Sequence, residues 1–212
     1  MLLRSPIETR KLCGQQVNHK TMNFLREKLV LASSSPRRTE LLNRAGWPHE
    51  VIVAGIDESV RPQEEPATYV KRLARTKAEA VAERLERGLV LGADTTVVID
   101  NQILGQPHDD DDAKRMLRLL NGRWHEVLTG VALVRVGGET RVDHETTRVR
   151  FAEMSESEID WYVASGEPSG KAGAYGIQGK AALFIEEIEG DYFNIMGLPI
   201  RLVYKLAADS RR

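Results

Sequence analysis

Cysteine is nearly absent from this chain of 212 residues, in which Cys13 is the only one. A single cysteine permits neither an intrachain disulfide nor a thiolate metal cluster, and it favours a reducing compartment. Long apolar runs are also missing, because no stretch approaches the roughly 20 residues that cross a membrane. We therefore expect a cytoplasmic protein without a membrane partner.

An excess of charge of one sign is missing too. The chain has 30 basic and 31 acidic residues, which give a formal net charge of −1. General nucleic-acid binders and membrane-surface binders carry an excess of basic residues. The balance predicts no nucleic-acid partner, while a hydrophobic content of 42% is enough to fill the core of a globular domain.

Several common site motifs are absent. The sequence has no GxxxxGK[ST] loop and no GxGxxG after an apolar strand, which argues against a P-loop enzyme and against a Rossmann dinucleotide site. It has no HExxH, and its histidines do not show the spacing of metal ligands. For His125, at the start of an expected strand, a packing or hydrogen-bonding role is the better interpretation.

The stretch Leu31–Arg38, with the sequence LASSSPRR, is the most informative feature that is present. An apolar strand leads into three serines, and Pro36 then opens a helix that ends at Gly46, with a serine as its expected N-cap. Arg37 and Arg38 fall in the first turn, where basic residues are unfavourable for the helix alone but free N–H groups attract anions. The pattern predicts a phosphate-binding turn, and the alternative is a capped surface helix with solvated arginines.

Two further segments carry charged residues in apolar surroundings. Lys77 lies on or beside the apolar stripe of an expected helix over residues 66–87, where a lysine either serves a site or extends its ammonium to solvent. Asp94 separates the apolar segments 89–93 and 97–99, which predicts two short strands with a carboxylate between them. Burying such a carboxylate is costly unless it binds something. The acidic run 109–112, by contrast, caps the next helix.

The order of expected elements mixes helices with parallel and antiparallel strands, which predicts an α/β fold. We expect a single domain over residues 28–208 and a peripheral N-terminal extension over residues 1–27. Basic groups, carboxylates and a glycine-rich segment that ends near Gln178 are the set required for cleavage of a phosphate ester or phosphoanhydride. From the residues alone, the chain is an anion-binding α/β protein and a candidate hydrolase.

Three motifs in this order resemble the Maf family of nucleoside triphosphate pyrophosphatases, named for septum formation. They are LASSSPRR at 31–38, GADTTVV at 92–98 and KAGAYGIQG at 171–179, and the resemblance extends over about residues 28–208. It implies an elongated mixed β-sheet flanked by helices, with a deep cleft between two lobes, as in inosine triphosphate pyrophosphatases. It also implies hydrolysis of a nucleoside triphosphate to the monophosphate and diphosphate, a divalent metal (Mg²⁺ or Mn²⁺) and a possible homodimer.

By position, the resemblance gives Asp94 the role of catalytic base, which would activate the attacking water and would contribute to the metal site. Lys77 matches a phosphate-handling residue at the catalytic centre, and Glu58 matches a carboxylate linked to metal binding. Ser33 and Arg38 match residues that bind the phosphates of the substrate. One departure concerns Gln106, because the family often has a lysine there, and the loss of charge puts one phosphate contact in doubt.

Three positions bear on the nucleobase. Arg37, Thr95 and Gln178 resemble the branch of the family that acts on dTTP and UTP, whereas the branch that prefers 7-methyl-GTP has an aromatic residue, a larger polar residue and an acid there. The physical chemistry agrees, because an arginine repels a cationic methylated base and an amide both donates to and accepts from a pyrimidine edge. We expect dTTP and UTP as substrates, with modified pyrimidine nucleotides as further candidates.

Other functions stay open at this point. A nucleotide-binding regulator of cell division with weak catalysis is favoured by Gln106 alone. A pyrophosphatase for 7-methyl-GTP would keep the family and change the base pocket. A nucleic-acid-binding module is the least supported alternative, because the chain is almost neutral.

Overall fold

The computed structural model describes residues 27–208. The extension predicted over residues 1–27 therefore lies outside the described residues except for Glu27, and Cys13 lies outside them as well. Within residues 27–208, none of the helices is both long enough and apolar enough to span a membrane.

A mixed β-sheet forms the centre of the molecule, in the strand order β2-β1-β3-β5-β6-β7 with β4 paired to β3. Strands β1 and β2 are parallel, β1 and β3 are parallel, and the remaining pairs are antiparallel. The strands are β1 (Leu29–Leu31), β2 (His49–Val51), β3 (Leu89–Ile99), β4 (Gln102–Leu104), β5 (Trp124–Arg135), β6 (Thr140–Phe151) and β7 (Ile185–Glu189). The expected mixed α/β fold is confirmed.

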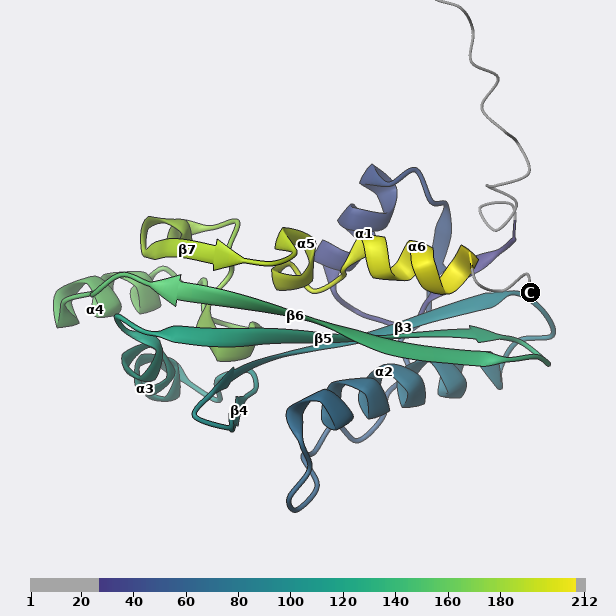
Figure 1. The fold of residues 1–212 in the computed structure, drawn as a ribbon, viewed down its shortest axis with the longest axis horizontal. Coiled ribbons are helices and arrows are strands. Elements are labelled where there is room, and N and C mark those ends of the chain that lie inside the picture. The colour runs from purple at the N-terminus through teal and green to yellow at the C-terminus, as the bar shows by residue number, and fades with distance from the viewer. Residues whose placement is uncertain (1–26, 209–212) are drawn as a thin grey trace, which may run out of the picture.

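Helices cover both faces and one end of this elongated sheet (Figure 1). Helix α2 lies along one face, α1, α5 and α6 lie on the opposite face, and α3 and α4 lie together at one end. The α-helices are α1 (Pro36–Arg44), α2 (Pro66–Ala82), α3 (Asp110–Leu120), α4 (Glu156–Ala164), α5 (Tyr192–Ile195) and α6 (Ile200–Ala208). Two short 3₁₀ helices, η2 (Ala172–Ala174) and η3 (Lys180–Leu183), follow α4.

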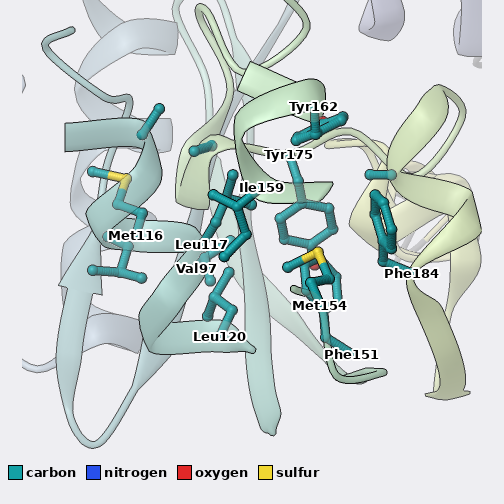
Figure 2. Packing of buried hydrophobic residues seen from close by; sticks show 14 of the residues in the cluster. Val97, Met116, Leu117, Leu120, Phe151, Met154, Ile159, Tyr162, Tyr175 and Phe184 are labelled. Carbon is teal, nitrogen blue, oxygen red and sulfur yellow. The ribbon is translucent and has the colours of Figure 1, made fainter. Parts of the chain in front are cut away.

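Two apolar cores occupy the two ends of the sheet. One core packs α1 and α6 against β1, β3 and β5, and it includes Leu31, Leu91 and Leu202. The other packs α3 and α4 against the far ends of β5 and β6, with Leu117, Tyr162 and other large side chains in contact (Figure 2). Since removing a large core side chain costs about 2–5 kcal/mol, each core holds its own end of the sheet in place. Two further clusters pack α2 against the sheet between Val30 and Leu128.

A gap on one edge of β3 lies between the two cores. Strand β1 pairs with β3 only over residues 89–91, and β4 pairs with it only over residues 97–99. The other edge of β3 pairs with β5 from Leu89 to Val98, so β1 and β4 share the first edge. Among residues 27–208, no strand pairs with this edge of β3 at the segment between β1 and β4, which contains Asp94. Ligands of α/β sheets commonly bind where strands end in this way.

One long strand replaces the two short strands predicted around Asp94. Strand β3 runs without interruption from Leu89 to Ile99, because β5 pairs with it throughout and compensates for the polar residues in its centre. Helix α2 packs closely on this part of the sheet. A Cβ on Gly92 would overlap the Ala74 carbonyl of α2. This close approach brings the α2 side chains within reach of Asp94.

Side chains cap α3, as the sequence predicts, and α4, but not α1. Asp109 caps α3 through its bond from the Asp112 N–H (2.8 Å), and Ser155 forms the capping box that opens α4. Ser35, at the N-cap position of α1, makes no side-chain cap, so the expected serine cap is wrong in that detail. The nearby Ser33 hydroxyl instead accepts a hydrogen bond from the Ser35 N–H. The first turn of α1 therefore has no side-chain cap, and it borders the gap.

Candidate active site

Two carboxylates meet on one ammonium group at the gap beside β3. The Lys77 Nζ lies 2.7 Å from Asp94 Oδ1 and 2.8 Å from Glu58 Oε2. Asp94 comes from the centre of β3, Lys77 from α2 and Glu58 from the loop that precedes α2. The Asp94 side chain is 9% exposed and the Glu58 side chain 54%, so the first is fixed in the protein and the second borders solvent. Lys77 points into the site, and the alternative of a solvent-directed lysine is excluded.

Burial controls the acidity of Asp94. Removal from water raises the pKa of this carboxyl group above its usual value, and the nearby Glu58 carboxylate raises it further. The positive charges of Lys77 and Arg38 act in the opposite direction and limit the rise. A carboxylate whose pKa is raised in this way accepts a proton more readily than an exposed aspartate does.

Arg38 is a buried cross-link rather than a free cation. Its Nε donates to the Gly197 carbonyl (2.8 Å), its Nη1 to Ser33 Oγ (3.0 Å) and to the Ala93 carbonyl (2.8 Å), and its Nη2 to Thr95 Oγ1 (3.1 Å). Four of the five guanidinium donors are thus used by the protein. Arg38 ties α1 to the centre of β3 and to the loop before α6, and one donor at most is left for a substrate.

Arg37, the neighbour of Arg38, has a different environment. Its side chain is half-buried and lines the cavity at the gap, and burial lowers its pKa from the usual arginine value. Among the described residues, no hydrogen bond holds its guanidinium. The two arginines that the sequence placed together in one turn therefore have separate roles, one structural and one directed at the cavity.

The cavity itself has a volume of about 700 Å³. Its wall contains eight of the nine residues proposed from the sequence: Ser33, Arg37, Arg38, Glu58, Lys77, Asp94, Thr95 and Gln106. The ninth, Gln178, lies in an adjoining cavity of about 330 Å³ that shares Arg37 and Tyr175 with the first. Residues from five separate stretches of the sequence thus converge on the larger cavity, and Gln106 reaches it from the loop after β4.

A comparison with models of protein families shows to which family this chain belongs. A model described as Maf-like protein matches residues 28–210. The chain belongs to the Maf family. A protein of Symbiobacterium thermophilum named dTTP/UTP pyrophosphatase is 55% identical over 174 residues, which cover 82% of this chain and 89% of that protein. One of Hahella chejuensis with the same name is 57% identical over 180 residues and covers 82% and 88%.

Solved structures agree with this Maf fold at low sequence identity. The Ham1 protein of Staphylococcus aureus superposes with a TM-score of 0.51 at 15% identity, covering 87% of this chain and all of that one. A HAM1 protein of Coxiella burnetii gives a TM-score of 0.50 at 16% identity and covers 86% and 99%. The likeness concerns the fold, including its elongated mixed sheet.

Sequence reasoning missed the residues that hold the Glu58 loop of this Maf protein. The Tyr69 hydroxyl donates to the Glu58 carbonyl (3.1 Å), and Arg72 Nη2 donates to the Ser59 carbonyl (3.0 Å). Arg72 also forms a two-point ion pair with Glu64, in which both bonds are 2.6 Å long and which lowers the Glu64 pKa to about 2. Tyr69 lies on the same helical stripe as Lys77, eight residues before it, and this periodicity could have identified it.

His125 and Asn194 make polar contacts with Tyr175 and Val127, two residues that line the larger cavity. His125 Nε2 lies 2.8 Å from the Tyr175 hydroxyl, and burial lowers the His125 pKa to about 4, so its ring is neutral. The expected packing and hydrogen-bonding role of His125 is confirmed. Asn194, which the sequence analysis overlooked, donates to the Val127 carbonyl (2.8 Å) and to Thr147 Oγ1 (3.0 Å), and so fixes α5 to β5 and β6.

The donor set suits a metal that is shared with a substrate. Within residues 27–208, no three histidine, cysteine, aspartate or glutamate side chains form a complete metal cage. Asp94 and Glu58 are nevertheless close to each other, since one oxygen of each lies within 3 Å of the Lys77 ammonium. Mg²⁺ is commonly held by one or two carboxylates together with substrate phosphates. The two carboxylates fit that pattern, with Lys77 as their counter-ion.

Proposed function

We propose that this chain hydrolyses dTTP and UTP to the nucleoside monophosphate and diphosphate. The observation that carries the proposal is Asp94, a buried carboxylate with a raised pKa in the wall of a cavity that is otherwise rich in cationic and hydroxyl groups. The relatives of Symbiobacterium and Hahella, both more than half identical, carry the name of this activity.

Asp94 is the proposed base of the reaction. Lys77 holds Asp94 Oδ1, so the second oxygen, Oδ2, can accept a proton from the water that attacks the α-phosphorus. Its raised pKa matches that role, because a base with the usual aspartate pKa would hold the proton only weakly. Lys77 keeps the carboxylate oriented and supplies positive charge beside the reacting phosphate.

The phosphate chain is proposed to lie along the gap beside β3. Arg37 and the uncapped first turn of α1 offer positive charge and N–H groups to it, and Ser33 offers a hydroxyl. Gln106 can donate a hydrogen bond from the opposite wall but adds no charge, which weakens one contact to the leaving diphosphate. Glu58 and Asp94 are the proposed holders of Mg²⁺ or Mn²⁺, and such an ion neutralises charge on the phosphates.

The nucleobase is proposed to enter the adjoining cavity, where Gln178 and Arg37 face it. An amide can pair with the alternating acceptors and donor of a thymine or uracil edge, and a guanidinium disfavours a cationic base. Thr95 lines the larger cavity and is fixed by hydrogen bonds with Arg38 and with Thr129 (2.9 Å). These groups support the pyrimidine preference over 7-methyl-GTP.

A diphosphate-release assay tests the proposal. Wild type and Asp94→Asn are compared on dTTP, UTP, CTP, GTP and 7-methyl-GTP, with Mg²⁺ and with Mn²⁺. We expect release from dTTP and UTP that is lost in the variant. Preferential release from 7-methyl-GTP would keep the reaction and reject the base preference. Tight nucleotide binding with no product from any substrate would favour the regulator, and gel filtration of the same sample tests the possible homodimer.

A further inference from the structure

Glu167, between α4 and η2, binds both ends of the segment that carries Gln178. Its carboxylate oxygens Oε1 and Oε2 accept from the Lys180 N–H at 3.1 and 2.9 Å. Its main-chain carbonyl accepts from the Lys171 ammonium. One residue thus connects positions 171 and 180 and closes the intervening segment into a loop.

Two glycines of this loop make room for the side chains that close it. A Cβ on Gly179 would overlap Glu167 Oε2, and a Cβ on Gly176 would lie 2.8 Å from the Lys171 side chain. Gly179 has a φ of −103°, which other residues also adopt. The space taken by the Glu167 carboxylate, and not the backbone conformation, is therefore what requires glycine at position 179.

The loop has a direct bearing on the base cavity. Glu167, Lys171, Tyr175 and Gln178 all line the cavity of about 330 Å³. Among residues 27–208, the exposed Gln178 amide has no hydrogen-bond partner, so its position depends on the backbone that carries it. That backbone is held on one side by the buried Tyr175 and on the other by the Glu167 bonds to Lys180.

We propose that Glu167 is a positioning residue for base selectivity, which acts by fixing the backbone of Gln178. The inference rests on the proposed function for its substrate, because it assigns the adjoining cavity to the nucleobase. Glu167 belongs to neither the Asp94 and Lys77 pair nor the phosphate wall of the larger cavity. Its loss should therefore change recognition of the base and leave the chemical step intact.

Steady-state kinetics of Glu167→Ala and Glu167→Gln on dTTP and CTP test the proposal. We expect Glu167→Ala to raise the KM for dTTP about tenfold, to lower the dTTP to CTP ratio of kcat/KM, and to change kcat by less than about twofold. Glu167→Gln keeps an acceptor oxygen and should retain most of the selectivity. The matched control is Glu156→Ala, which removes an α4 carboxylate bound to Arg118 outside both cavities.

A double-mutant cycle of Glu167 and Gly179 isolates the contact between the Glu167 carboxylate and position 179. Gly179→Ala alone should displace the Glu167 carboxylate and reproduce the kinetics of Glu167→Ala. In the double variant Glu167→Ala/Gly179→Ala the added methyl meets no carboxylate, so it should have no further effect. Additive losses in the cycle, or a loss of kcat with the dTTP to CTP ratio unchanged, would overturn the proposal.

Hydrogen exchange at the Lys180 amide gives a readout that needs no substrate. We expect faster exchange in Glu167→Ala than in wild type and near-normal protection in Glu167→Gln. Unchanged protection of the Lys180 amide in Glu167→Ala would reject the proposal that Glu167 holds the loop, even if all variants are active. A wild type that hydrolyses neither dTTP nor CTP would instead reject the proposed function and its selectivity, while the exchange result would still decide whether Glu167 holds the loop.

Discussion

The two walls of the cavity differ in how firmly their side chains are held. On the sheet wall, Asp94, Lys77 and Arg38 are buried and bound to one another or to main-chain groups. On the loop wall, Gln106 at the larger cavity and Gln178 at the adjoining cavity are exposed and carried by connecting segments. Groups that must react need fixed geometry, whereas groups that select a ligand can vary on loops around a rigid scaffold. The contrast suggests that chemistry belongs to the first wall and selection to the second.

Removal of the base on the sheet wall should have the largest effect. Asp94→Asn keeps the size of the side chain and removes its capacity to accept a proton, so we expect kcat to fall about 10²- to 10⁴-fold with little change in substrate binding. Single-turnover hydrolysis and nucleotide binding measure the two separately. Near-normal kcat would remove Asp94 as the base.

The pH profile of the wild type also tests the role of Asp94 as the base. Because burial raises the Asp94 pKa, the carboxyl group stays protonated to a higher pH than an exposed aspartate. Only the deprotonated form accepts a proton, so activity should decline as the pH falls through this raised pKa. The acidic limb of kcat/KM against pH, which reports the free enzyme, should lie above the usual aspartate value of about 4. A limb at or below that value would contradict the assignment.

Arg38 and Arg37 allow a direct comparison between a buried, hydrogen-bonded arginine and one that faces the cavity. Arg38→Lys cannot serve four acceptors with three donors in the same geometry, so we expect a loss of about 2–4 kcal/mol in the free energy of unfolding. Arg37→Lys should change that free energy by less than about 0.5 kcal/mol and mainly raise the KM. Urea unfolding of both variants measures the difference, and equal stability losses would break the comparison.

Selection of the nucleobase is tested by exchange of the two residues that are proposed to face it. Arg37→Trp combined with Gln178→Glu places an aromatic surface and a negative charge where a cationic base can bind. We expect kcat/KM to fall for dTTP and to rise for 7-methyl-GTP, with the ratio shifting about tenfold or more. An unchanged ratio would place the base elsewhere.

The smallest expected effect concerns Gln106. Gln106→Lys adds a positive charge at an exposed position on the loop wall, where attraction to the substrate phosphates is weakened by solvent. We expect kcat/KM for dTTP to rise by about two- to tenfold, and more at low salt than at high salt. The matched exposed variant Gln102→Lys, on β4 outside both cavities, should leave it unchanged.

The sequence by itself determined the fold class and most of the local structure. Alternating apolar runs and helix-start residues gave the order of strands and helices, because burial of apolar side chains and capping are short-range requirements. The motifs around Ser33, Asp94 and Gln178 contain six of the nine proposed site residues, and their order indicated the family. These features depend on residue type and spacing, which a sequence displays directly.

Only the tertiary structure decided which of these residues are free to act. It paired Lys77 with two carboxylates, turned Arg38 inward and left Arg37 at the cavity, and it placed Glu167 against Gly179. Each of these outcomes depends on groups that are distant in the chain, such as Gly197 for Arg38. The availability of a side chain is set by its partners across the fold, and sequence spacing carries no information on those contacts.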